Sequence, residues 1–192
     1  MATVQPTWGE IVDSHSSLTA DDLLRLPDDG YRYELYEGTL VREMTSPGHG
    51  AICQRIGFEL GLYARASGVI KPDQIIQNAL FDLASAGSAN REVFAPDVAL
   101  LRSTAPPSWN VPRDTPLLAV EVISESQTLA ELATKAQIYR QAGVEEVWLI
   151  DHKSRTVEIW SAGGMTTLDD TQALTSALLP GFSVSVRYLL DG

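Results

Sequence analysis

The sequence of 192 residues has a single cysteine, Cys53. One cysteine excludes an internal disulfide framework and any zinc or iron–sulfur site built from several cysteines. No apolar run approaches the ~20 residues of a membrane span, and the N-terminal MATVQPTWGE lacks the basic-then-apolar pattern of a signal peptide. A phosphate-binding G-x-x-x-x-G-K-S/T loop is also absent, so an ATP-driven enzyme is not indicated. We therefore expect a cytoplasmic protein that does not enter a membrane.

Positive charge is scarce: 14 Lys and Arg stand against 25 Asp and Glu, for a net charge of −11. DNA repels such a protein at long range, so composition does not suggest non-specific nucleic-acid binding. An acidic balance does suit clustered carboxylates that hold a divalent cation. Hydrophobic residues make up 44% of the chain, which is typical of a folded domain. Composition alone leaves the function open.

The order of the predicted elements indicates a mixed α/β protein. We expect a loosely ordered, irregular segment over residues 1–18 and one domain over 19–192. Its first half should contain a short helix capped by Thr19, a hairpin over 31–44, a helix over 49–66 and one or two strands over 69–83. Its second half should contain strands over 93–101, 117–123 and 146–151, a helix over 128–141, a hairpin strand over 155–161 and a final strand or short helix.

Two acidic residues interrupt apolar strands in the second half. Asp97 lies in VFAPDVALL and Glu121 in LLAVEVI. A buried, unpaired carboxylate costs several kcal/mol or more, so each must be neutralised, paired or bound to a cation. Neighbouring central strands would bring both to one place, where hard oxygen ligands favour Mg²⁺ or Mn²⁺. The alternative is that each acid pairs with a nearby arginine, or that its strand is shorter than drawn.

Lys135 is the third residue that does not fit its surroundings. At ~100° per residue, Leu132 and Tyr139 lie to one side of it on the predicted helix and Ile138 to the other. Lys135 therefore points into the apolar face, toward the sheet that carries Glu121. It could reach a carboxylate pair, a metal-bound water or a phosphate oxygen. Alternatively, its stem packs in the core while its ammonium reaches solvent.

These residues resemble the PD-(D/E)XK nuclease motif, because Pro96-Asp97 is followed 24 positions later by a strand glutamate. More specifically, the chain is similar to the Uma-type restriction endonucleases of that superfamily from about residue 31 to residue 190. The similarity is carried by PDVALL, PLLAVEVISESQT, ELATKAQIYRQAGVEEVWLID and the opening YELYEGTLVREMTSPGHG. It implies a restriction-endonuclease-like mixed central sheet flanked by helices.

The resemblance also implies roles for single residues. Asp97 and Glu121 match the two metal-binding acids. The usual lysine two positions after the glutamate is replaced by Ile123, and Lys135 matches a lysine that this family takes from the following helix. His49 and Glu34 match polar positions of the family's N-terminal part.

Periodicity gives an independent expectation for these last two residues. His49 lies on the same helical face as Ile56 and Leu60, so it points inward, as a third metal ligand or as a hydrogen-bonded core residue. Glu34 alternates with its neighbours, which alone predicts a solvent-facing side chain.

Two functions follow from these observations. The first is a metal-dependent DNA endonuclease with Mg²⁺ or Mn²⁺ held by Asp97 and Glu121, and with Lys135 supplied by the helix. The alternative is a catalytically silent binding or assembly module of the same fold, which the charge of −11 favours. DNA is the expected partner of the first, and a homodimer is plausible because two copies of one site can cut both strands. The basic residues that could gather at the mouth of such a site are Arg91, Arg102, Arg113, Lys135 and Arg140.

Overall fold

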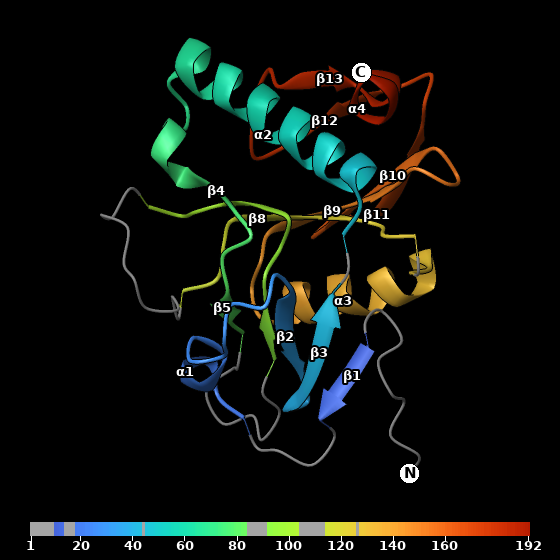
Figure 1. The fold of residues 1–192 in the computed structure, drawn as a ribbon. Helices are drawn as coiled ribbons and strands as arrows, with labels where there is room; N and C mark the ends of the chain where they lie inside the picture. The colour runs from blue at the N-terminus through green and yellow to red at the C-terminus, as the bar shows by residue number, and fades with distance from the viewer. Residues whose placement is uncertain (1–9, 14–17, 44, 84–91, 104–113, 126) are drawn as a thin grey trace.

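The computed structural model describes residues 10–13, 18–43, 45–83, 92–103, 114–125 and 127–192. They form two main sheets with helices between and outside them (Figure 1). Within the described part of the chain, no helix combines the length and the apolar character needed to cross a bilayer. The predicted class, a mixed α/β fold with a central sheet flanked by helices, is confirmed.

The larger sheet has six strands in the order β11-β10-β9-β8-β7-β4. Only β8 and β9 are parallel, joined by helix α3 (Leu129–Gln141) as the predicted βαβ unit, whereas the other neighbours are antiparallel. The strands are β4 (Ile75–Gln77), β7 (Val98–Leu100), β8 (Leu118–Val122), β9 (Glu146–Asp151), β10 (Thr156–Ser161) and β11 (Gly164–Asp169).

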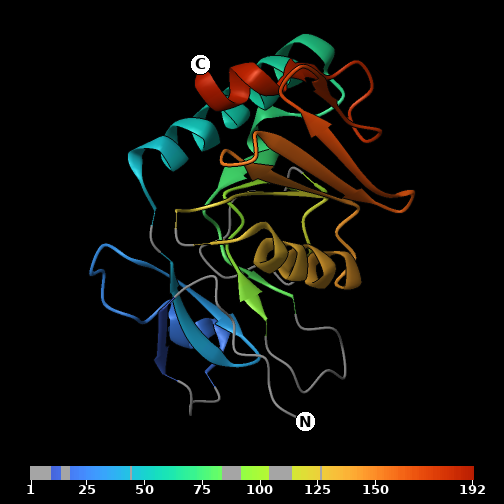
Figure 2. The ribbon, with the colours of Figure 1, turned by 90° about the vertical axis from the view of Figure 1, so that its right-hand side faces the viewer.

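A helix covers each face of this sheet. Helix α2 (Pro47–Ser67) lies on one face and α3 on the other, as both views show (Figures 1 and 2). Residues of β8 divide accordingly: Val120 packs in the core under α2, and Ala119 in the core under α3. Because successive strand residues point to opposite faces, Glu121 shares the face of Ala119.

The smaller sheet has the order β1-β3-β2-β6-β5 and contains the N-terminal hairpin. Its strands are β1 (Glu10–Asp13), β2 (Arg32–Tyr36), β3 (Thr39–Glu43), β5 (Phe81–Asp82) and β6 (Val93–Phe94). The remaining elements are α1 (Ala20–Leu23), the 3₁₀ helix η1 (Pro72–Gln74), the β12–β13 pair (Ala173–Thr175 and Ser183–Ser185) and α4 (Val186–Asp191).

Local capping places the helices close to where the sequence predicts them. Thr19 caps α1 and Thr128 caps α3, each in a capping box with the acidic residue three positions later. Helix α2 ends at Gly68, whose φ of 67° is a left-handed conformation that glycine adopts without steric cost.

The strand predicted over 93–101 is wrong, because the segment forms two strands in different sheets. β6 pairs with β2 and β5, whereas β7 pairs with β8 and β4. Pro96, between them, has no N–H to donate to a sheet, so pairing is interrupted there. Asp97 consequently lies where the chain passes from one sheet to the other.

Three further regions of the chain differ from the prediction. The irregular structure expected at the N-terminus is wrong for residues 10–13, which form β1 against β3. Strands β11 and β12 were not predicted. The C-terminal segment contains a strand followed by a helix, where one or the other was expected.

Candidate functional site

Asp97 and Glu121 meet at one end of the larger sheet. β7 and β8 pair with Val98 opposite Val120, and the same register continued by one residue places Asp97 opposite Glu121. Directly opposite side chains lie on one face of a sheet. Both carboxyl groups are buried, 1% and 3% exposed, and line one pocket. The expectation that the two acids converge is confirmed, and their role as metal ligands stays a prediction.

The carboxylate of Asp97 is held in place from two sides. The backbone N–H of Val122 donates to Asp97 Oδ2 at 2.8 Å. His49 Nε2 lies 3.1 Å from the same oxygen. Arg32 lies 3.0 Å from Oδ1, which is buried and accepts no well-oriented hydrogen bond from the described residues. One oxygen of Asp97 is therefore satisfied, and the other has capacity for a further ligand.

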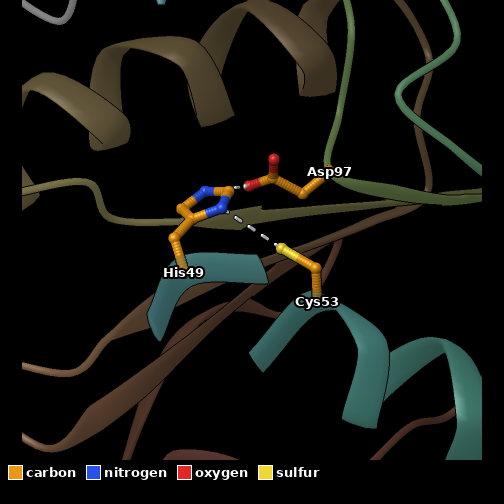
Figure 3. Close-up of side chains that lie close together, drawn as sticks. All are labelled: His49, Cys53 and Asp97. Atoms are coloured by element: carbon orange, nitrogen blue, oxygen red, sulfur yellow. Dashed lines mark hydrogen bonds and ion pairs between the residues drawn. The ribbon is translucent and has the colours of Figure 1, made fainter. Parts of the chain in front are cut away.

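His49 points inward from the first turn of α2, as predicted. Ser46 caps this helix end by accepting from the His49 N–H, which fixes where the imidazole leaves the helix. Cys53 lies one turn later, with Sγ 3.5 Å from His49 Nδ1, so the imidazole stands between thiol and carboxylate (Figure 3). One ligand atom from each of His49, Cys53 and Asp97 lies within 4.8 Å of the others, close enough to hold a metal ion.

Lys135 is fully buried, so its ammonium does not reach solvent. Its Nζ lies 2.9 Å from Glu34, 3.2 Å from Glu43 and 3.1 Å from Glu121. The inward orientation predicted from the helical periodicity is confirmed. The lysine therefore joins the hairpin of the smaller sheet to β8 of the larger one.

Glu34 does not face solvent, and that prediction is wrong. Its side chain is fully buried, with Oε1 accepting from the Ala95 N–H at 2.7 Å. The strand face that alternation alone assigned to water is instead covered by Lys135 of α3. Alternation shows which residues share a face, but it does not show what covers that face.

Sequence reasoning missed three members of this cluster: Arg32, Glu43 and Tyr139. Arg32 is opposite Glu43 in the hairpin, and the two form an ion pair at 2.5 Å. The predicted hairpin already places these two opposite charges across from each other, so this pair could have been found from the sequence. Tyr139 donates to Glu121 Oε1 at 2.6 Å. Tyr139 lies four residues after Lys135, about one helical turn, so the periodicity that predicts an inward Lys135 predicts an inward Tyr139 as well.

The cluster carries a surplus of negative charge. Its carboxylates are Glu34, Glu43, Asp97 and Glu121, and its permanent cations are Arg32 and Lys135. Four negative against two positive charges leave a formal surplus of two when His49 is neutral. A buried surplus of this kind must be balanced by protons or by a bound cation.

The pKa shifts in the cluster divide the acids into two groups. Burial raises the pKa of Glu121 to about 7, against the opposing charge of Lys135. Burial and the charge of Glu43 raise the pKa of Glu34 well above its usual range. Burial also opposes ionisation of Asp97, but the His49 hydrogen bond and the Arg32 charge hold the pKa of Asp97 below its usual value. Asp97 is thus the ionised acid of the facing pair, whereas Glu121 loses its proton only near neutral pH.

The residues present fit a small divalent cation. The pocket beside Asp97 and Glu121 measures about 10 Å³, which is room for one water-sized ligand. Carboxylate oxygens suit Mg²⁺ or Mn²⁺, and the Asp97 carboxylate lies with His49 and Cys53 in the group whose ligand atoms are close enough to hold one ion. Glu121 lines the same pocket but is not a member of that group. The Oδ1 atom of Asp97, which accepts no well-oriented hydrogen bond from the described residues, supports the same fit.

Of the basic residues considered above, the three that the structure describes do not line this pocket. Arg102 pairs with Glu145 at 2.6 Å, and Arg140 donates to the Val144 carbonyl, both near the start of β9 rather than at Glu121. Lys135 is occupied by three glutamates. Arg91 and Arg113 lie outside the described residues. Among the described residues, the cation that lines the pocket is Arg32.

The arrangement of sheets and helices matches that of a solved structure. It is similar to a crystal structure described as a "putative nuclease belonging to DUF820" from Anabaena variabilis, with a TM-score of 0.72 over 91% of this chain and 98% of that one. The identity is 17%, so this likeness concerns the fold alone. No curated protein matches the sequence.

Residues 20–187 match the family model Uma2, described as "Putative restriction endonuclease". The chain belongs to this family, and the resemblance drawn from PDVALL and the motifs after it is confirmed.

Proposed function

We propose that this protein is a metal-dependent endonuclease that hydrolyses phosphodiester bonds in DNA. The observation that carries the proposal is the pair of buried carboxyl groups, Asp97 and Glu121, on neighbouring strands at one pocket. Membership of a restriction endonuclease family supports the reaction class. The restriction-endonuclease resemblance and the family description make DNA the substrate of this proposal.

Asp97 and Glu121 are the ligands proposed for Mg²⁺ or Mn²⁺, with His49 as a third. These residues would hold the ion, and the chemistry it would supply is Lewis-acid activation of the scissile phosphate and of water. The surrounding protein groups orient the two carboxylates. The Val122 N–H and His49 fix the Asp97 carboxylate, and Tyr139 fixes that of Glu121. The two carboxylates are thereby fixed before substrate arrives, which favours catalysis because no reorganisation is then needed.

Lys135 acts in this proposal mainly through Glu121. Its ammonium contacts Glu121 Oε1, and it is not among the side chains lining the pocket. It keeps Glu121 oriented, contacts Glu34 and balances the negative charge of Glu43. Lys135 is therefore a positioning residue in this arrangement, and the cation facing a phosphate in the pocket is Arg32.

The test is cleavage of plasmid and oligonucleotide DNA in the presence of Mg²⁺ or Mn²⁺. We expect Glu121→Gln to lower the cleavage rate by at least about 100-fold, as for other groups that stabilise charge in a transition state. The matched control is Glu146→Gln, which changes another buried strand glutamate that binds Trp148 and Ser176 outside the pocket. Equal cleavage by Glu121→Gln and the unmodified protein would contradict the assignment.

A catalytically silent binding or assembly module is the second candidate, and the net charge of −11 favours it. Gel shifts at low salt separate the two, because a DNA-binding protein loses affinity steeply as salt rises.

The nuclease proposal includes a homodimer, since two copies of one site cut both strands of a duplex most simply. Sedimentation with and without duplex DNA measures that assembly.

A further inference from the structure

A second cavity adjoins the acid cluster on the side of the hairpin and α1. It measures about 230 Å³, much more than the pocket at Asp97. Arg32 lines both cavities, and its side chain is 23% exposed. The guanidinium thus stands between the site proposed for hydrolysis and a larger space beside it.

The walls of this second cavity combine two aromatic side chains, Tyr31 and Tyr33, with aliphatic groups. Tyr31 is 47% exposed, and one face of its ring is covered by the Arg42 guanidinium, 4.2 Å from the ring centroid. Leu26 and Pro27 contribute apolar wall. Such a combination accepts a flat ring, because every base has a π-face that stacks on an aromatic side chain.

The charged side chains that line the cavity are one cation, Arg32, and one anion, Asp28. Asn78 accepts a hydrogen bond from Arg32 through Oδ1, and its side-chain N–H groups donate to none of the described residues, so they can donate to a ligand. Asp28 also lines the cavity and disfavours a second phosphate there, while its carboxylate accepts hydrogen bonds from N–H groups. A ligand with one phosphate at Arg32 and a neutral ring bearing N–H groups fits this pattern.

The geometry points to a subsite for a single nucleobase next to the scissile phosphate, with Arg32 on the phosphate and Tyr31 under the base. The volume lies below the ~300 Å³ typical of drug-sized pockets, so it suits one ring system and not a base pair. The base must therefore be unpaired, in a single strand or extruded from a duplex. This inference rests on the proposed function and specifies its substrate as DNA with an unpaired nucleotide at the cleavage position.

The first measurement is binding of labelled oligodeoxynucleotides to the full chain without divalent cations, so that nothing is cut. Three probes share one sequence: a single strand, a perfect duplex and a duplex with one bulged nucleotide. We expect the single strand and the bulged duplex to bind at least about tenfold more tightly than the perfect duplex. Equal affinity for the perfect and bulged duplexes would overturn the inference.

The second measurement uses variants of the exposed aromatic residue. Tyr31→Ala should weaken binding of the single strand about tenfold, within the range seen when a stacking aromatic is removed, and Tyr31→Phe should restore it. The matched control is Tyr188→Ala, an exposed tyrosine of α4, which should leave affinity unchanged. An unchanged affinity of Tyr31→Ala would also overturn the inference.

Failure of the subsite and failure of the proposed function give different results. If the protein cuts DNA with Mg²⁺ or Mn²⁺ and Tyr31→Ala cuts and binds like the unmodified protein, the subsite is wrong and the nuclease stands. If no DNA is bound or cut under any condition, the proposed function is wrong and the subsite falls with it.

Discussion

Lys135 occupies a position that a lysine tolerates only because three carboxylates surround it. Burial alone would lower its pKa, but the charges of Glu121, Glu34 and Glu43 raise the pKa of Lys135 well above its usual value. We expect Lys135→Met to lower the free energy of unfolding by about 3–5 kcal/mol, because it leaves uncompensated buried charge. Urea unfolding measures this loss, and exposed Lys71→Met, as control, should change stability little.

The double variant Lys135→Met with Glu43→Gln makes the same prediction testable if the single variant does not fold. Against the effect of burial, the charges of Lys135 and Arg32 hold the pKa of Glu43 below its usual value, so this change removes an ionised partner of Lys135 and should recover part of the lost stability, since residues in one ion-pair network are not additive. A single variant that is as stable as the unmodified protein would show that the four groups are not coupled as the contacts indicate.

Glu34 makes stability depend on pH. Its pKa is raised well above the ordinary 4.5 by burial and by Glu43, so the folded chain keeps a proton that the unfolded chain releases. The stability this group contributes is therefore full below about pH 4.5 and falls as pH rises toward the folded pKa. Glu34→Gln mimics the protonated form, so its stability relative to the unmodified protein should rise between about pH 5 and pH 8.

Denaturation in urea across that pH range measures the difference for Glu34. Glu37→Gln, an exposed change at the turn of the same hairpin, is the control and should show no such trend. A stability difference for Glu34→Gln that is constant with pH would mean that Glu34 is ionised throughout.

At the scale of elements, α3 carries Lys135 and Tyr139 to the acids, and its capping box fixes where it starts. Thr128 Oγ1 accepts from the Glu131 N–H, and Glu131 accepts from the Thr128 N–H at 2.7 Å. Thr128→Ala should cost about 1 kcal/mol of stability, the usual value of an N-cap. Thr134→Ala, within the same helix, should be neutral or slightly stabilising, because alanine is the better helix former. Thermal unfolding of both variants checks this, and equal melting temperatures would contradict it.

Helices and strands that capping residues and apolar runs specify were predicted well. Strands whose position depends on which other strands they pair with were predicted less well. Helix α3 and strand β9 follow from capping and from an apolar run between turn signals. The segment over residues 93–101 is apolar throughout, so its pattern could not show that β6 and β7 belong to different sheets. The division of this segment into β6 and β7 depends on the strands with which each one pairs. It places Asp97 at the end of the larger sheet.

For the whole molecule, the charge surplus at the site predicts a response to divalent cations. A cation that binds only the folded chain at 100 times its dissociation constant adds about 2.7 kcal/mol of stability, or roughly 5–10 °C in melting temperature for a chain of this length. Asp97→Asn should abolish the rise caused by Mg²⁺ or Mn²⁺, whereas exposed Asp73→Asn should retain it. Calorimetry with and without the cation measures both, and no rise in the unmodified protein would favour the silent module.

The sequence by itself determined the class of fold, the family, the inward direction of Lys135 and His49, and the two acids set in apolar strands. These depend on period, capping and residue type, which are local properties of the chain. Only the tertiary structure decided that Glu34 is buried, that Arg32 and Glu43 join the cluster, and that Arg32 separates two cavities. Those facts depend on which element covers each face, and that is settled by packing between segments far apart in the chain.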